Sequence, residues 1–123
     1  MQKLLYVGVG GFIGACLRYL VSTGLTKSLG TQFPYGTLVV NVIGGVLIGL
    51  IMELGLNAHL ISPELKLFLT TGVMGGLTTF STFSYETVGF LSDGRYFTGI
   101  LNICLNLFLS IAGVMLGKFL PNI

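Results

Sequence analysis

One stretch of the chain, residues 72–84, constrains the fold more than any other feature. It lies inside a long apolar segment, yet it holds three glycines and five hydroxyl side chains. Within hydrocarbon, a weakened helix is tolerated only where protein buries it or where it lines a wet cavity. Glycine eases the departure from helical geometry, and hydroxyls can satisfy freed carbonyls or face a permeating solute. We therefore expect a membrane helix that is broken near Gly75–Thr78, which is a recurring way to build an ion site.

Composition independently favours a membrane protein. Of the 123 residues, 53% are hydrophobic and 8% are charged, whereas soluble domains carry about 25% charged residues. Six basic and four acidic residues without a basic run give no sign of nucleic-acid binding. Cys16 and Cys104 both lie in apolar stretches, so neither a disulfide framework nor a metal site is expected from them. The length allows one membrane domain that covers residues 1–123.

Hydropathy predicts an all-α fold with four membrane-spanning helices, because a span takes about 20 mostly apolar residues. The four predicted spans cover residues 3–25, 35–56, 62–91 and 96–120. Loops are expected at residues 27–34, 57–59 and 92–95, and His59 in the second loop is expected to be solvated. Ser62 followed by Pro63 is typical of a helix start. We interpret the N-terminal apolar run as a retained span, because its apolar character continues past Arg18.

The charges of the predicted loops and ends give almost no preferred orientation in the membrane. With four spans, one side holds Lys3, Lys66 and Lys118, and the other side holds Lys27 and Arg95. Lysine and arginine normally accumulate on the cytoplasmic side, and three against two is a very small bias. We therefore expect insertion in both orientations. Two opposite copies would pair as an antiparallel, dual-topology homodimer, which supplies the walls that four helices alone lack.

Three polar stripes at helical spacing lie within the predicted spans. They comprise Thr37 and Asn41 in the second span, Thr79 with Thr82 or Phe83 and Glu86 in the third, and Asn102, Asn106 and Ser110 in the fourth. Polar atoms in hydrocarbon are costly unless they have partners. Hydrogen bonding between helices explains any single stripe. Three stripes together with a helix break favour a polar pathway.

Phe80 and Phe83 are three residues apart, and the expected helix places them on one face. Such a pair usually packs in a core or against lipid, but ring edges are electropositive and can stabilise a dehydrated anion. The surrounding hydroxyls favour this second use. Arg18 has two possible roles, either as an interfacial anchor beside Tyr19 or as a group that attracts anions into a vestibule.

Residues 10–19, 36–44 and 72–86 resemble the signature blocks of the Fluc (CrcB) fluoride channels, and the similarity runs over most of the chain. The resemblance implies a fluoride-selective channel that exports F⁻ passively across the bacterial inner membrane and lowers cytoplasmic fluoride. It also implies a multi-pass, antiparallel homodimer with two pores, each built from both subunits.

The resemblance further implies roles for individual residues. The fluoride pore would be lined by Phe80, Phe83, Asn41, Thr37, Ser81, Thr82, Ser84 and Ser110. Arg18 matches an arginine of the family's vestibule. The main-chain carbonyls of Gly75 and Thr78 would hold a central, structural Na⁺, and carbonyl oxygens are hard ligands that suit a hard cation.

Two other classes of protein compete with this interpretation. A small dual-topology, proton-coupled multidrug exporter also has four spans, but it is expected to need a carboxylate in the membrane. The first span here has no acidic residue and instead carries Arg18. A structural or assembly subunit would leave the break in the third span without a purpose. An enzyme is not expected, because no pairing of a nucleophile with a base is visible.

Overall fold

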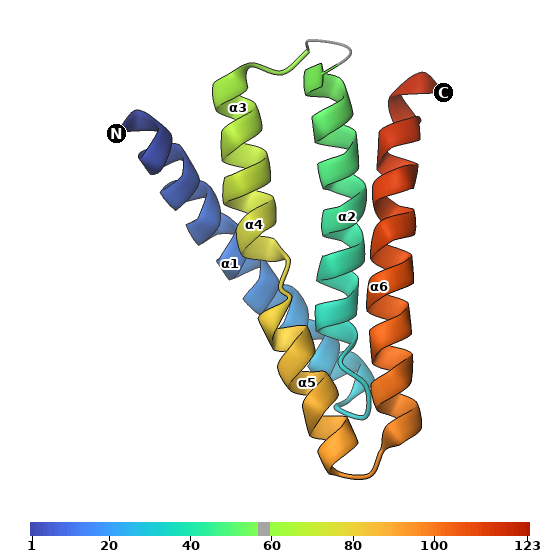
Figure 1. Cartoon of the computed structure of the whole chain (residues 1–123). Coiled ribbons are helices and arrows are strands. Elements are labelled where there is room, and N and C mark those ends of the chain that lie inside the picture. Colours follow the sequence, from blue (N-terminus) through green and yellow to red (C-terminus); the bar gives the residue numbers. More distant parts are fainter. Residues whose placement is uncertain (57–59) are drawn as a thin grey trace.

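The computed structural model describes residues 1–56 and 60–123, and every regular element in these ranges is a helix (Figure 1). The chain begins with α1 (Gln2–Leu29) and α2 (Tyr35–Leu56). Its third segment comprises α3 (Pro63–Leu67), the π-helix η1 (Phe68–Met74), α4 (Gly75–Leu77) and, after a break, α5 (Ser81–Ser92). It ends with α6 (Tyr96–Phe119) and the 3₁₀ turn η2 (Leu120–Asn122). The predicted loop at 57–59, with His59, lies outside the described residues.

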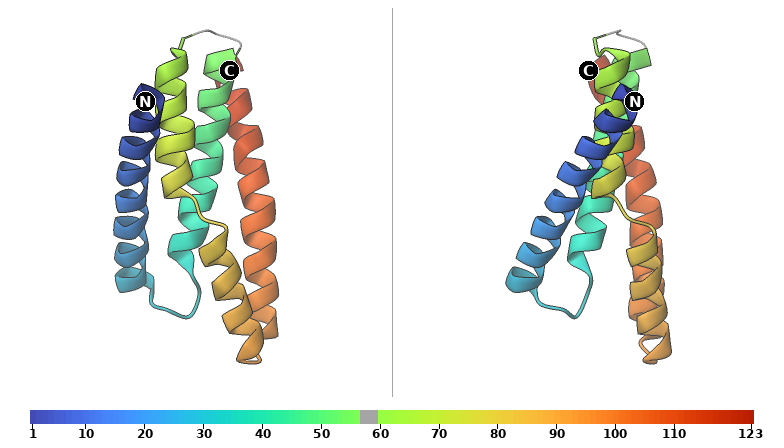
Figure 2. Two further views of the ribbon diagram at one scale, coloured as in Figure 1. Left: turned by 60° about the vertical axis from the view of Figure 1, so that its left-hand side comes forward. Right: turned by 90° about the vertical axis from the view of Figure 1, so that its left-hand side faces the viewer.

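Within residues 1–56 and 60–123, three stretches of helix are long and apolar enough to cross a membrane: Gln2–Leu29, Tyr35–Leu56 and Tyr96–Asn122. The third segment of the chain contains no single helix of that length among the described residues, because it is divided. Its first part, α3 to α4, runs beside the upper half of α2, and α5 continues toward the lower end of the molecule (Figures 1 and 2). The two parts together therefore cover the same height as the neighbouring long helices.

Several of the predicted helix boundaries are confirmed. The second span, 35–56, coincides with α2, and the fourth differs from α6 by one residue. Ser62 caps α3 by accepting a hydrogen bond from the Leu65 amide at 3.2 Å, with Pro63 as the first helical residue. The first span is longer than predicted, because α1 continues to Leu29 and ends at Gly30, where φ is +86°. Glycine tolerates this left-handed conformation.

The predicted break in the third segment is confirmed, and it begins at Thr78. Gly75 is helical, with φ −62° and ψ −37°, and the helix continues to Leu77. Non-helical backbone begins at Thr78, which is extended, with φ −84° and ψ 158°. Gly76, two residues before the break, serves contact with α1: a Cβ on it would lie 2.9 Å from the Ala15 amide nitrogen. A real Cβ needs more space than that, so glycine is required there for packing.

Close packing of the helices depends on glycine. A Cβ on Gly10 of α1 would lie 2.8 Å from the Cα of Gly72 in η1. In the contact between α2 and α6, a Cβ on Gly45 would lie 2.7 Å from the Ser110 carbonyl oxygen, and one on Gly113 would lie 3.0 Å from the Val42 carbonyl oxygen. Backbones approach directly at these points, which is the usual basis of helix association in membranes.

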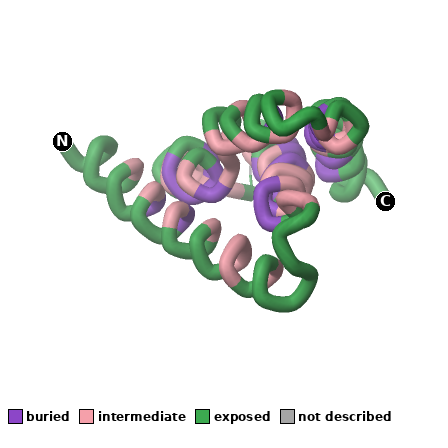
Figure 3. Tube along the Cα trace, turned by 90° about the horizontal axis from the view of Figure 1, so that it is seen from below, coloured by how far each residue is buried: buried purple, intermediate pink, exposed green. Residues whose placement is uncertain are grey.

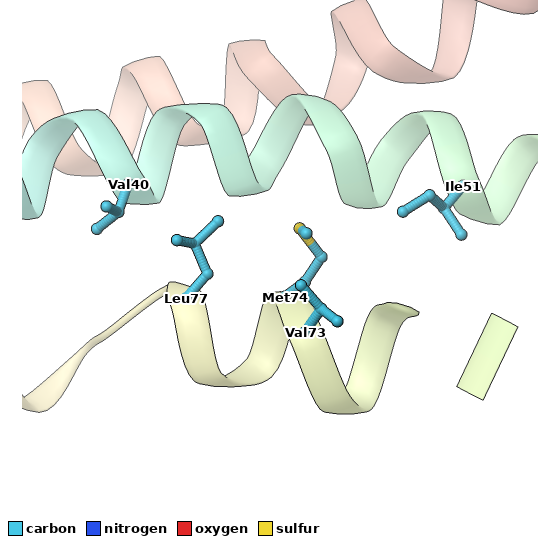
Figure 4. Packing of buried hydrophobic residues seen from close by; sticks show 5 residues of the cluster. All are labelled: Val40, Ile51, Val73, Met74 and Leu77. Atoms are coloured by element: carbon cyan, nitrogen blue, oxygen red, sulfur yellow. The ribbon is translucent and has the colours of Figure 1, made fainter. Parts of the chain in front are cut away.

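The buried apolar core is small and lies between α2 and the upper part of the third segment. Figure 4 shows Val40 and Ile51 of α2 facing Val73, Met74 and Leu77. Buried positions cluster on the inward faces, and the outward faces are exposed (Figure 3). Large apolar side chains on those outward faces are suited to contact with lipid rather than water.

Replacing Gly14 by alanine tests the importance of backbone contact between α1 and the third segment. The added Cβ would collide with the Val73 carbonyl oxygen, and overpacking of this kind costs about 1–3 kcal/mol. We expect a lower unfolding temperature for the purified protein in detergent. Gly8→Ala is the matched control on the same helix, because a Cβ added there would meet no neighbouring atom of the described chain within 4 Å. Equal unfolding temperatures for the two variants would contradict the packing argument.

Candidate functional site at the helix break

The side chain of Asn41 holds the main chain of Thr79 at the break. The Thr79 amide donates to Asn41 Oδ1 at 2.8 Å, and Asn41 Nδ2 donates to the Thr79 carbonyl at 3.0 Å. Buried main-chain groups must find partners, and here one side-chain amide satisfies both groups of a non-helical residue. The break is thus stabilised from α2, across the gap between two helices.

Two carbonyls near the break lose the donors that a continuous helix would provide. The Thr79 amide would donate to the Gly75 carbonyl in such a helix, but it donates to Asn41. Likewise, the Thr82 amide donates to the Thr79 hydroxyl at 3.2 Å rather than to the Thr78 carbonyl. Gly75 and Thr78 are the two residues that the resemblance assigned to Na⁺.

Gly75 and Thr78 also line a common hollow of about 300 Å³, together with Asn41, Phe80 and Ser110. The described part of the chain contains no group of three His, Cys, Asp or Glu side chains that could hold a metal ion. A cation in this hollow would therefore have to rely on carbonyl and hydroxyl oxygens, which suit a hard ion.

Arg18 lies next to the break and donates from Nε to the Gly76 carbonyl at 3.0 Å. Its side chain is half-buried. The guanidinium is thereby placed at the C-terminal end of the upper helical part, where carbonyl groups are unpaired and a positive charge is favourable. Of the two roles left open by the sequence, an anchor at the membrane surface does not account for this bond.

The two phenylalanines form a ring pair, with centroids 5.5 Å apart and planes inclined at 55°. Phe80 is the N-cap residue of α5, with helical backbone angles of φ −94° and ψ −38°, and Phe83 lies in the first turn of that helix. The rings line a second hollow of about 390 Å³ together with residues of α2 and α6: Asn41, Ile103, Asn106, Leu107, Ser110 and Ile111. Phe80 is 79% exposed, so this protomer alone covers little of its ring.

The remaining predicted pore residues are distributed along α5 and its contacts. Ser81 is exposed at the start of α5, and Thr82 is half-buried beside it. The Ser84 hydroxyl donates to the Phe80 carbonyl at 2.9 Å. Thr37 of α2 donates from its hydroxyl to Glu86 Oε2 at 3.0 Å. The structure therefore brings Thr37 to Glu86, one helical turn from the ring pair, rather than to the rings themselves.

The polar stripe of α6 is buried and joins the break to α5. Asn41 Nδ2 donates to Asn106 Oδ1 at 2.9 Å, and Asn106 Nδ2 donates to Asn102 Oδ1 at 2.9 Å. Asn102 Nδ2 then donates to the hydroxyl of Thr87 at 3.0 Å. Sequence reasoning did not select Thr87. Its one signal was a position four residues after Phe83, which places it on the same helix face.

The fold and the site define a small, all-helical membrane protein whose buried polar groups surround a broken helix. Residues 5–118 match the family model described as "CrcB-like protein, Camphor Resistance (CrcB)". The chain is similar to proteins named "Fluoride-specific ion channel FluC". It is 56% identical to the one from Clostridium perfringens (strain 13 / Type A), over 100% of this chain and 98% of the relative. It is 49% identical to the one from Geobacter sulfurreducens, over 95% of this chain and 94% of the relative. The chain therefore belongs to the CrcB family.

Removing the Thr37 hydroxyl tests the contact between α2 and Glu86. In Thr37→Val the Glu86 carboxylate loses its hydroxyl donor, while its Oε1 already lacks a hydrogen-bond partner among the described residues. Leaving a buried polar group unsatisfied costs about 1–3 kcal/mol, so we expect a lower unfolding temperature in detergent. Thr37→Ser keeps the hydroxyl and should stay close to the parent protein. A valine variant as stable as the serine variant would show that this bond contributes nothing.

Proposed function

We propose that this chain is a fluoride-selective ion channel that lets F⁻ leave the cell passively across the bacterial inner membrane and so lowers cytoplasmic fluoride. The observation that carries the proposal is the hollow beside the ring pair. Its lining, within the described residues, consists of amide, hydroxyl, aliphatic and aromatic groups and includes no charged side chain. The names of the relatives from Clostridium and Geobacter support the choice of ion.

The lining of this hollow suits an anion that has to bind and leave quickly. Fluoride is small and strongly hydrated, so a pathway must replace its water with other donors. Ring edges of Phe80 and Phe83 carry partial positive charge, and the hydroxyl of Ser110 can donate a hydrogen bond. A fixed cation would bind too tightly for release, and conduction requires binding that is weak enough to leave.

The proposal includes an antiparallel homodimer of dual topology, with the third segment as the fourth crossing and with two pores. Exposure of Phe80 supports it, because a ring that is 79% exposed in one protomer can be covered by a second copy. The small charge bias between the two sides also supports insertion in both orientations. Each pore would then be built from both subunits.

A central Na⁺ fits the carbonyl oxygens at the break. The carbonyls of Gly75 and Thr78 have lost their helical donors, and both residues line the same hollow. A cation on the twofold axis would join the two breaks and supply positive charge near the anion pathway. The residues of this chain would hold the ion through main-chain oxygens, which a change of side chain does not remove.

The competing interpretations have less support. The relatives are named as ion channels and not as exporters, assembly subunits or enzymes. A proton-coupled multidrug exporter is also disfavoured by the absence of a carboxylate in α1, whose charged residue at mid-helix is Arg18.

Fluoride efflux from proteoliposomes, measured with a fluoride electrode, tests the proposed function directly. The purified protein should release fluoride far faster than protein-free vesicles and should release little chloride. We expect Phe80→Ile and Phe83→Ile to slow fluoride efflux by about tenfold or more, because isoleucine has no electropositive ring edge. Phe97→Ile, which changes an exposed ring of α6, is the control and should have no effect. Vesicles that retain fluoride would refute the function.

Labelling of single cysteines tests the proposed orientation. A cysteine placed near either terminus, in a protein without Cys16 and Cys104, should react only partly with an impermeant maleimide in intact cells. Both orientations are then present, and permeabilisation should expose the rest. The near balance of charges predicts this result. Complete labelling, or complete protection, at both termini would exclude dual topology.

A further inference from the structure

We propose that Asn102, Asn106 and Thr87 are positioning residues for the ring pair. With Asn41 they form a chain of hydrogen bonds, here called the amide chain, that fixes the main chain on both sides of Phe80. The proposal can be tested in two ways. One test measures fluoride transport and rests on the proposed channel function, and the other measures hydrogen exchange of side-chain amides and does not.

The first step is that both amide hydrogens of Asn41 are already engaged. An asparagine amide has two N–H groups, and those of Asn41 point to the Thr79 carbonyl and to Asn106 Oδ1, at 3.0 and 2.9 Å. Its own carbonyl oxygen accepts from the Thr79 amide. In this arrangement Asn41 lines both hollows and holds the main chain of Thr79.

The second step is that the rest of the amide chain dictates this orientation of Asn41. The Thr87 hydroxyl has one hydrogen and donates it to the Phe83 carbonyl at 2.8 Å, so it can only accept from Asn102. Asn102 must therefore direct Nδ2 to Thr87 and its oxygen to Asn106. Asn106 in turn directs its nitrogen to Asn102 and its oxygen to Asn41. Each amide sets the direction of the next.

The third step is burial. Asn102, Asn106 and Thr87 are 0%, 5% and 6% exposed, so water has little access to replace a lost partner. Buried networks of this kind are rigid when every member is satisfied, and they are costly when one member is lost. At one end of the amide chain, Asn41 binds the main chain of Thr79, and at the other end Thr87 binds the Phe83 carbonyl. Phe80 lies between these two residues in the sequence. The amide chain therefore determines where the two rings stand relative to α2 and α6.

The test compares two substitutions at one position. Thr87→Val has nearly the same shape as threonine but can neither accept from Asn102 nor donate to Phe83, whereas Thr87→Ser keeps both bonds. We expect fluoride efflux to fall about tenfold in Thr87→Val, since a buried amide loses its partner, and to stay within about twofold of the parent in Thr87→Ser. Equal efflux in the two variants would overturn the proposal.

A second readout does not depend on transport. Side-chain amide hydrogens of Asn41 should exchange slowly with solvent in ¹⁵N NMR spectra of the detergent-solubilised protein, and faster in Thr87→Val and Asn106→Leu. Asn122 is exposed near the end of the chain and gives the reference for fast exchange. Asn122→Asp is the matched control for any change of an asparagine and should leave both efflux and the Asn41 signals unchanged.

The two readouts separate the failure of the amide chain from the failure of the proposed function. If the parent protein conducts no fluoride, the function is wrong, and the exchange rate of Asn41 still decides the amide chain. If the parent conducts but its Asn41 amide exchanges as fast as that of Asn122, the amide chain is wrong and the channel function stands. If Thr87→Val does not fold, the exchange rate of the Asn41 amide in the parent and in Thr87→Ser decides whether the amide chain is correct.

Discussion

The pairing of the Asn41 side chain with the main chain of Thr79 is the interaction on which the rest of the site depends. Each unsatisfied main-chain group in hydrocarbon costs several kcal/mol, so a break without this amide would be unstable. A third segment that closed into a continuous helix would return the Thr79 amide to the Gly75 carbonyl. The hydrogen bonds at 2.8 and 3.0 Å thus maintain both the freed carbonyl and the non-helical backbone that presents Phe80.

The scaffold separates the contacts that hold the helices together from those that shape the site. Lipid provides no hydrophobic drive for helix association, so close backbone contact has to replace it. Gly10 meets η1, and Gly45 meets α6, at distances that exclude any side chain. Amides and hydroxyls can therefore occupy the space between α2, α5 and α6, because association of the helices does not depend on a large apolar core. A small core and a buried polar network are consequences of the same use of glycine.

Sequence reasoning located those features whose causes are local. Ser62 and Pro63 marked a helix start, and spacing by four placed Asn102 and Asn106 on one face. The break was located to within a few residues, but its start at Thr78 could not be fixed, because glycine has two uses and Gly76 serves packing against α1. The hydrogen bond from Arg18 to the Gly76 carbonyl joins residues 58 apart in sequence, and a main-chain acceptor leaves no trace in residue type. Fluoride itself came only from family resemblance, because donors of this kind suit many anions.

The two hollows beside the break differ in electrostatic character, which agrees with the proposed cation in one and the proposed anion in the other. Gly75 and Thr78 contribute carbonyls without helical donors to one hollow, and carbonyl oxygen is negative. The other hollow is lined by Phe83 as well as Phe80, and the edges of aromatic rings are positive. Asn41, Phe80 and Ser110 line both hollows, so the two regions share part of their walls. An ion bound on either side would make the other side more favourable for an ion of opposite charge, because attraction between unit charges is strong where the effective dielectric constant is low.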